Sequence, residues 1–322
     1  MVVQALVRAR HQVAVYDNLS RGHIAAVPAE VDFIQGDVSD RDKLDSVFSR
    51  SSFDAVMHFA ASIEAGESMQ APERYFRNNS AATLTLLESM LAHRVKRLVF
   101  SSTAALYGDP ERVPISEDEP LRPTNVYGES KLLVEQMLTW LNRIHGLRYC
   151  SLRYFNAAGA SENLGEAHDP ESHLIPLILQ AAAGRREAIH IFGTDYPTED
   201  GTCIRDYIHV RDLATAHTLS LEALSSHTRL IYNLGNGRGF SVRQVIETAG
   251  SVTGRAIPAI ESPRRAGDPA VLVASSEKIR RELDWRPQYP QLEQIIESAW
   301  QWMRAHPQGY AAGQEQQVQW PA

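Results

Sequence analysis

The 322-residue sequence contains only two cysteines, Cys150 and Cys203, which lie far apart in the chain. Two such cysteines exclude a disulfide-rich scaffold, and they lack the spacing of a cysteine metal centre. Sparse, unpaired cysteines are typical of proteins that work in a reducing compartment. The sequence therefore predicts a cytoplasmic location and no metal ligands.

The chain also lacks long apolar runs and an excess of positive charge. Its longest apolar stretch, residues 174–184, includes Gln180 and is shorter than the roughly 18 residues of a membrane span. Arg8 and Arg10 interrupt the start too early for a secretory signal. A net charge of −7 offers no electrostatic basis for binding nucleic acid or an anionic membrane. We therefore expect a small-molecule substrate as the partner.

The first half alternates short β-branched runs with longer helical patterns, which is typical of βαβ units on a parallel sheet. We predict a doubly wound α/β sheet in residues 1–156 and a smaller α/β substrate domain in residues 157–322. A strand near residues 231–234 is predicted to return to the main sheet. The predicted strands of the first half cover residues 13–16, 31–35, 55–59, 98–101 and 149–154, and the predicted helices of the chain include residues 42–49, 72–93, 126–145 and 174–183.

The strongest chemical signal is the segment NVYGESK, in which Tyr127 and Lys131 stand four residues apart at the start of a helical pattern. This spacing is about one helical turn, so both side chains share a face and the ammonium can favour the phenolate. Tyr127 is therefore predicted to exchange a proton, with Lys131 lowering its pKa. The preceding strand ends in Ser101, Ser102 and Thr103, and strand ends of parallel sheets line ligand crevices. Taken singly, these features are also common on helices and at turns.

Two acidic residues end predicted strands in the first half of the chain. Both residues suit the adenosine part of a dinucleotide. Asp17 can accept hydrogen bonds from the adenosine ribose, and Asp37 can contact the edge of the adenine ring. A carboxylate rather than an arginine at the ribose favours NAD over NADP. Each of these residues can equally be a helix cap or a turn residue.

Glycine is absent from the start of the chain, because the first glycine is Gly22. A dinucleotide-binding fold places its acidic residue about 20 positions after a glycine-rich loop. Counting back from Asp17 leads to a point before Met1, and residues 2–7 already have helical spacing. We therefore predict that Met1 is an internal or misassigned start and that the first strand and glycine-rich loop are missing. The 322-residue chain is then expected to fold badly, bind NAD poorly and show little activity.

Several longer segments together resemble the UDP-glucose 4-epimerase family of extended short-chain dehydrogenases/reductases. The resemblance extends from about Val2 to Tyr310, and residues 192–210 are very specific to the family. It implies reversible interconversion of UDP-glucose and UDP-galactose, in galactose metabolism, by transient oxidation at sugar C4 with tightly bound NAD. The segments are HFAA, NN at 78–79, SSTAALYG, YGESK, LRYFNAAGA, IFGTDYPTEDGTCIRDYIHV, YNLGNG, RRAGDP and HPQGY.

The resemblance also implies roles for individual residues. Tyr127 exchanges a proton with the hexose 4-hydroxyl, Thr103 hydrogen-bonds to that hydroxyl, and Lys131 holds the nicotinamide ribose. The cofactor-binding residues would be Asp17, Asn18, Asp37, Val38, Phe59, Ala60, Ala61, Asn78, Ser101, Tyr127, Lys131 and Tyr154. The substrate-binding residues would be Thr103, Asn156, His173, Phe192, Arg205, Tyr207, Arg265, Asp268 and Leu272.

Two of these substrate positions carry further expectations. Arg205 and Arg265 suit a diphosphate because guanidinium groups are permanently charged, bidentate donors, although either can instead form a surface salt bridge. Leu272 falls where some family members carry a tyrosine that closes the space beside the sugar C2 substituent. The smaller leucine predicts turnover of UDP-N-acetyl sugars as well.

Two other functions compete with epimerisation. A nucleotide-sugar 4,6-dehydratase needs an added acid and base directly after the active-site threonine, but Thr103 is followed by Ala104 and Ala105. A non-catalytic nucleotide-sugar or NAD sensor has no need for Tyr127, Lys131 and Thr103 together. Because the glycine-rich loop is absent, a sensor function stays an alternative.

A homodimer is expected from two helical segments that carry more apolar surface than packing on one sheet requires. Simple packing on the sheet is the alternative. The residues concerned are Leu84, Leu87, Met90 and Leu91 in one segment and Leu133, Met137, Trp140, Leu141 and Ile144 in the other.

Overall fold

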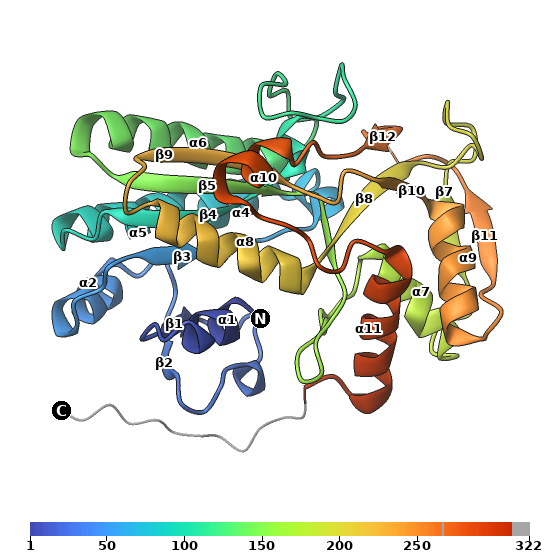
Figure 1. Cartoon of the computed structure of the whole chain (residues 1–322), viewed down its shortest axis with the longest axis horizontal. Coiled ribbons are helices and arrows are strands. Elements are labelled where there is room, and N and C mark those ends of the chain that lie inside the picture. Colours follow the sequence, from blue (N-terminus) through green and yellow to red (C-terminus); the bar gives the residue numbers. More distant parts are fainter. Residues whose placement is uncertain (266, 311–322) are drawn as a thin grey trace.

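A four-stranded parallel sheet lies at the centre of the computed structural model, which describes residues 1–265 and 267–310 (Figure 1). Its strand order is β3–β4–β5–β9. Strand β9 pairs with β5 in parallel, which confirms the predicted return of residues 231–234 to the main sheet. The strands are β3 (Val56–His58), β4 (Arg97–Thr103), β5 (Arg148–Tyr154) and β9 (Arg229–Leu234).

Helices cover both faces of this sheet, as the α/β prediction requires (Figure 1). Leu98 and Phe100 of β4 pack on one face with α2 (Arg41–Arg50), α5 (Ala82–Ala92) and α6 (Val126–His145). Val99, between them, points to the opposite face, where α8 (Val210–Ala223) and α10 (Glu277–Leu283) pack. Because successive side chains of a strand alternate between faces, one apolar run serves both cores.

Helix α6 matches its predicted range because its ends are fixed locally. The Asn125 side chain accepts a hydrogen bond from the Gly128 amide at the N-terminus. At the C-terminus Gly146 adopts a left-handed conformation with φ of 68°, which glycine favours. These local signals bracket the helix that carries Tyr127 and Lys131.

The first two strands form a separate parallel sheet, so the predicted single sheet is interrupted. Strand β1 (Ala14–Asp17) pairs with β2 (Asp32–Gln35), with Asp17 opposite Gln35. Helix α1 (Val2–Arg8) precedes β1, as the helical spacing at the start predicts, and packs against α8. Among the described residues no strand bridges β1 and β3, and Figure 1 shows the β1–β2 unit set apart from the main sheet.

The predicted helix 72–93 contains an irregular segment. It is divided into α4 (Pro72–Tyr75), a π-helical turn (Phe76–Ala81) and α5. In that turn the Asn79 side chain hydrogen-bonds the Ser62 amide and carbonyl at 2.8 and 2.9 Å. It also reaches the Ser130 hydroxyl on α6 at 3.0 Å. A polar side chain that ties three segments together is a tertiary requirement that the helical spacing of the sequence does not reveal.

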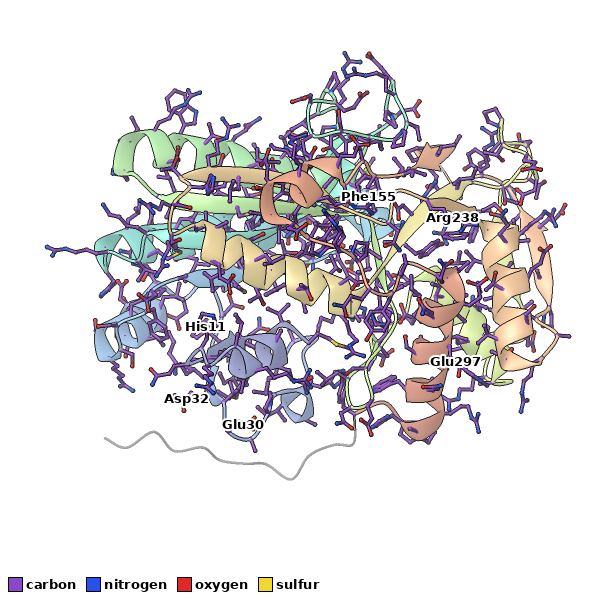
Figure 2. The ribbon with its side chains drawn as sticks, in the orientation of Figure 1. His11, Glu30, Asp32, Phe155, Arg238 and Glu297 are labelled. Atoms are coloured by element: carbon purple, nitrogen blue, oxygen red, sulfur yellow. The ribbon has the colours of Figure 1, made fainter. Side chains whose placement is uncertain are left out.

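The second half builds a smaller mixed sheet around β8 (Ile204–His209), with a helical layer beside it (Figure 1). Figure 2 shows Phe155 near the middle of the molecule, where the two halves meet. The predicted boundary after residue 156 stays a prediction, because α8 and β9 return to the main sheet from beyond it. The remaining elements are α3 (Ala65–Ser68), β6 (Asn156–Ala158), α7 (Leu174–Ala182), β7 (Ile189–Phe192), β10 (Gly239–Ser241), α9 (Val242–Thr253), β11 (Ala259–Ser262), β12 (Val271–Leu272) and α11 (Leu292–Ala305).

None of the helices in the described part of the chain has the length and apolar character needed to cross a membrane. This finding agrees with the lack of long apolar runs in the sequence.

Candidate active site

Tyr127, Lys131 and Thr103 come together at the carboxyl end of β4. Tyr127 lies in the first turn of α6, and Thr103 is the last residue of β4. The Thr103 side chain hydrogen-bonds with the Tyr127 phenol and also accepts from the Ala105 amide at 3.1 Å. Lys131 is buried and donates from Nζ to the Ser101 carbonyl at 2.9 Å. The structure thus groups the three predicted catalytic side chains.

The electrostatics of this group differ from the sequence prediction. Burial raises the pKa of Tyr127, the Glu64 carboxylate raises it further, and the hydrogen bond with Thr103 lowers it. Burial also lowers the pKa of Lys131 to about 7. The Lys131 ammonium is directed to the Ser101 carbonyl. In this structure desolvation outweighs the expected cation effect.

A buried ion pair behind this group was missed by sequence reasoning. Glu135 lies four residues after Lys131 on α6 and accepts from the Ser102 hydroxyl at 2.7 Å. Its carboxylate also pairs with Arg153 of β5, with Nη2 to Oε2 at 2.6 Å. The network therefore fastens α6 to both β4 and β5. The 127–131–135 spacing is the signal that could have revealed an acidic residue on the buried face.

The predicted adenosine-binding residues gather at the carboxyl ends of β1 and β2. Asn18 donates to an Asp37 carboxylate oxygen at 2.7 Å, and Ser39 donates to the other oxygen from its amide and its hydroxyl. These hydrogen bonds from Ser39 hold the pKa of Asp37 below its usual value. Asp17 accepts from the Leu19 amide at 2.7 Å, and Val38 directly follows Asp37.

His217, which the sequence analysis did not predict as a site residue, contacts two predicted cofactor residues. These are Phe59, directly after β3, and Tyr154, at the end of β5. The Phe59 ring, 44% exposed, stacks on His217 of α8 with centroids 4.9 Å apart. The other side of His217 hydrogen-bonds through Nε2 with the Tyr154 hydroxyl. Ala60 and Ala61 continue the chain after Phe59. No local pattern marks His217, because α8 comes from a distant part of the sequence.

Asn78, another predicted cofactor residue, lies in the π-helical turn. Asn78 donates to the Ser62 hydroxyl at 3.3 Å and to Asn79 Oδ1 at 3.1 Å. Ser62 follows directly after Ala61, so Asn78 lies beside the segment that leaves β3. The turn therefore brings the two predicted cofactor segments together.

The residues present fit two parts of an NAD molecule. Asp17 and Asp37 offer carboxylates at the adenosine end, and Lys131 offers its ammonium at the nicotinamide ribose. Helix α1 begins at Val2, with Met1 as its N-cap. The described chain contains no glycine turn before β1. The predictions that this 322-residue chain folds badly and binds NAD weakly therefore stay predictions.

Most of the predicted substrate residues collect around β8 and β12. Arg205 pairs with the Asp268 carboxylate, and the Arg265 guanidinium lies 3.9 Å from the Phe192 ring centre. Leu272 stands opposite Arg205 in the strand pairing and packs in a cluster that contains Ala104, the residue after Thr103. Strand β12 thus links Arg205 of β8 to the cluster around Ala104.

Of the other predicted substrate residues, Asn156 begins β6 and Tyr207 lies on β8, whereas His173 lies outside this sheet. Asn156 donates from Nδ2 to the Asp206 carbonyl at 3.0 Å. Tyr207 is buried in the apolar core of the second half, and this burial raises its pKa. His173 lies just before α7, bonded to Glu171 at 2.8 Å and stacked on His168. Within the described residues none of the three forms a hydrogen bond or ion pair with Arg205 or Arg265.

Asp206 is a further residue that sequence reasoning missed. It is fully buried and accepts from the amides of Asn236, Gly237 and Ala274. Burial raises the pKa of this carboxyl to about 6. Asp206 therefore ties β8 to the loop between β9 and β10 and to the segment after β12, next to Arg205.

Residues 1–235 match the NAD dependent epimerase/dehydratase family. The chain belongs to this family. A UDP-glucose 4-epimerase of Halalkalibacterium halodurans is 54% identical over 93% of this chain and 90% of its own length. The UDP-glucose 4-epimerase of Streptomyces lividans is also 54% identical, over 96% of this chain and 94% of its own length. The crystal structure of UDP-glucose 4-epimerase from Brucella ovis in complex with NAD is 45% identical and covers 93% of both chains, with a TM-score of 0.90.

Membership of the NAD dependent epimerase/dehydratase family agrees with the α/β fold and its parallel sheet. The similarity extends past residue 235 through most of the second half, which carries Arg265, Asp268 and Leu272. The predicted resemblance to the epimerases is thus confirmed over nearly the whole chain.

Proposed function

We propose that this chain is an NAD-dependent UDP-glucose 4-epimerase, which interconverts UDP-glucose and UDP-galactose. The observation that carries the proposal is the joint placement of Tyr127, Thr103 and Lys131 at the end of β4. The names of the relatives, at 54% identity over most of the chain, support the same activity.

Each catalytic side chain has a role that follows from its position. Tyr127 takes the proton of the sugar 4-hydroxyl and later returns it, while Thr103 orients that hydroxyl. NAD, when bound, supplies reversible hydride acceptance from sugar C4. Lys131 orients the nicotinamide ribose through its buried ammonium. Because the intermediate is a flat 4-keto sugar, its rotation allows the hydride to return to the opposite face.

The two arginines supply the anchor around which the sugar rotates. Arg205 and Arg265 approach the site from β8 and from the segment before β12, and their charges match a diphosphate. Asp268 pairs with Arg205 and so fixes the guanidinium in place. An anchor that grips only the nucleotide leaves the hexose free to turn.

The alternative functions have less support. Elimination of water requires an acid and a base beside C5 and C6, but the short turn after Thr103 begins with Ala104 and Ala105. A sensor would need neither the buried Lys131 nor its alignment with Tyr127. Both alternatives predict no conversion of UDP-galactose to UDP-glucose.

The proposal is tested by assaying the purified 322-residue chain with UDP-galactose, with and without added NAD. We expect UDP-glucose formation that depends on NAD, because NAD supplies the hydride acceptor for sugar C4. Bound NAD is measured from released cofactor in the same preparation. Turnover with neither bound nor added NAD would contradict the NAD dependence, and no turnover at saturating NAD would contradict the epimerase assignment.

Leu272 is proposed to leave room for a larger group at sugar C2. We expect detectable turnover of UDP-N-acetylglucosamine, and we expect Leu272→Tyr to reduce it about 10-fold or more with little change for UDP-glucose. Leu272→Met, which nearly conserves volume, serves as the control. The idea fails if the parent does not turn over the N-acetyl sugar, or if the tyrosine variant does so equally well.

We also propose that two copies associate through α5 and α6. Some residues of the predicted dimer face are buried in the core, and others are exposed. Leu87 and Met90 are buried in the core, whereas Trp140 and Ile144 are 61% and 68% exposed and Leu84 is 38% exposed. We expect Trp140→Arg to convert a dimer to a monomer in sedimentation velocity, because a charge in an apolar interface is not compensated.

The control for this test is Ile260→Arg, at a 51% exposed position on β11 in the other half of the chain. It should leave the dimer intact. A parent protein that sediments as a monomer, or a Trp140→Arg variant that remains dimeric, would rule out this interface.

A cytoplasmic location is proposed from the thiols. Cys150 and Cys203 are both free and buried. Unpaired thiols are typical of proteins that work in a reducing compartment. Fractionation of cells with an antibody against the chain is the direct test.

A further inference from the structure

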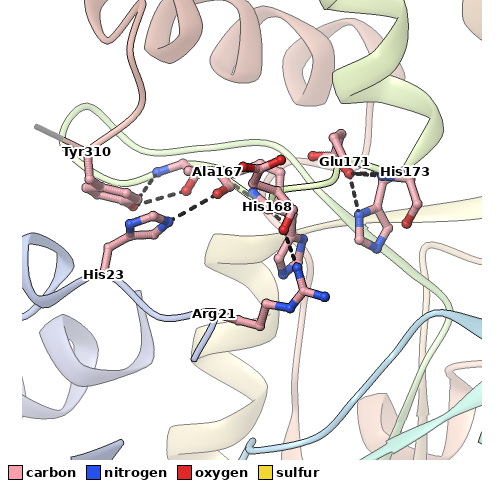
Figure 3. A network of polar contacts seen from close by, with 11 residues as sticks. Arg21, His23, Ala167, His168, Glu171, His173 and Tyr310 are labelled. Atoms are coloured by element: carbon pink, nitrogen blue, oxygen red, sulfur yellow. Dashed lines mark hydrogen bonds and ion pairs between the residues drawn. The ribbon is translucent and has the colours of Figure 1, made fainter. Parts of the chain in front are cut away.

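A loop between β6 and α7 brings two histidines and two glutamates into one cluster. The potential ligand atoms, one from each residue, all lie within 4.8 Å of one another. Figure 3 shows His168, Glu171 and His173 from this loop side by side. The histidine rings are stacked with centroids 5.2 Å apart, so both imidazoles face the same small volume. The four residues, here called the loop cluster, are Glu166, His168, Glu171 and His173.

Backbone amides orient both carboxylates of the loop cluster. One oxygen of Glu166 accepts from the amides of Ala167 and His168 at 3.0 and 3.1 Å. One oxygen of Glu171 accepts from the amides of Ser172 and His173 at 2.7 and 2.8 Å, and the Glu171 side chain is only 6% exposed. Such supporting hydrogen bonds are the means by which proteins fix ligands in advance of an ion.

Contacts from distant segments hold the loop itself. Arg21 donates to the Asp169 carbonyl, and His23 Nε2 lies 3.1 Å from the Ala167 carbonyl (Figure 3). The Tyr310 hydroxyl lies 3.0 Å from both the amide and the carbonyl of Gly165. The loop is therefore fastened to the segment after β1 and to the segment after α11.

One ring nitrogen in the loop cluster has no hydrogen-bond partner among the described residues. His168 Nδ1 is buried and lies 2.8 Å from a Glu166 oxygen, but the contact does not have hydrogen-bond geometry. His173 Nδ1 lies 2.8 Å from a Glu171 oxygen. At 2.8 Å each histidine nitrogen is in direct contact with a carboxylate oxygen, and a bound ion would take the place of these contacts.

We propose that the loop cluster binds one first-row transition metal ion of the zinc type. Two imidazole nitrogens and two carboxylate oxygens are a donor set for zinc, cobalt or nickel, whereas calcium and magnesium prefer oxygen alone. Bonds of about 2.0–2.2 Å place tetrahedral ligand atoms roughly 3.3 Å apart. The ligand atoms, now within 4.8 Å of one another, would have to adjust to this spacing when an ion binds.

The ion would tie the start of the loop to the start of α7. Because Arg21 and His23 hold the same loop, a bound ion would also strengthen the connection between the β1–β2 unit and the second half. The sequence prediction assigned no metal ligands, because the four residues lie in a single loop without a recognised metal motif. The inference concerns binding alone and does not rest on the proposed epimerase activity.

The test uses Co²⁺ with the untagged full-length chain after treatment with a chelator. We expect one Co²⁺ per chain in equilibrium dialysis and visible absorption bands of a four-coordinate ion, displaced by Zn²⁺. His168→Asn and Glu171→Gln should each weaken retention about 10-fold or more. Circular dichroism of each variant shows whether it is folded, and His227→Asn, at an exposed position after α8, is the matched control.

Three outcomes would overturn the proposal. The first is no Co²⁺ retained by the parent chain at concentrations well above those of the protein. The second is equal retention by the parent and by a His168→Asn/His173→Asn double variant that folds normally. The third is loss of the absorption bands in His227→Asn, which would place the ion elsewhere.

Discussion

Replacing Tyr127 with phenylalanine should lower kcat for the interconversion of UDP-galactose and UDP-glucose by about a thousandfold at saturating NAD. The substitution removes only the hydroxyl that is placed to exchange a proton, and it leaves the ring packing of α6 intact. Binding of UDP should be unchanged, because the proposed anchors are Arg205 and Arg265. Turnover and calorimetric titration with UDP measure the two effects separately.

Tyr149→Phe is the matched control for this substitution. Tyr149 is buried on β5, and its hydroxyl contacts the Thr139 hydroxyl at 3.0 Å. Its loss should cost about 1 kcal/mol of stability with little effect on kcat. If Tyr127→Phe retained near-parental turnover, Tyr127 would not be the proton-exchanging group, even if the epimerase assignment held.

Replacing Glu135 with glutamine should lower the free energy of unfolding by about 3–5 kcal/mol. The side chains of Glu135 and Arg153 are 6% and 3% exposed, so the substitution leaves a buried guanidinium without its counter-charge. The Ser102 hydroxyl loses its charged acceptor at the same time. Urea denaturation monitored by circular dichroism gives the change.

A surface pair at a similar distance provides the comparison. Arg122 and Glu111 are 2.7 Å apart but 67% and 60% exposed, and Arg122→Ala should cost at most about 1 kcal/mol. Converting the buried pair to apolar residues, as Glu135→Leu with Arg153→Met, should recover much of the loss. Equal costs for Glu135→Gln and Arg122→Ala would show that burial does not set the strength of this pair.

A kinetic measurement tests whether the buried Glu135–Arg153 pair also positions Tyr127. Glu135 fastens α6 to β4, so Glu135→Gln should shift Tyr127 relative to Thr103. We expect kcat to fall by a larger factor than any change in KM. Measuring both constants below the unfolding temperature separates this effect from simple instability. An unchanged kcat in a folded Glu135→Gln protein would limit the pair to a structural role.

Local sequence signals determined much of the first half of this protein. Helix α6 follows from its apolar spacing between the Asn125 cap and Gly146, and that spacing alone placed Tyr127 one turn before Lys131. Strands β4 and β5 were recognisable because buried parallel strands are short, continuous apolar runs. The family resemblance then pointed to the nucleotide-sugar site, whose residues lie in distant segments.

Other features depended on contacts between segments that are remote in the sequence. The π-helical turn exists where Asn79 reaches Ser62 and Ser130, which helical spacing does not encode. The raised pKa of Tyr127 reflects desolvation by the packed site, which the spacing between Tyr127 and Lys131 does not encode. The pairing of Glu135 with Arg153 likewise required β5 to pack beside α6. Sequence periodicity determined which faces are buried, and tertiary packing decided which charged groups meet inside them.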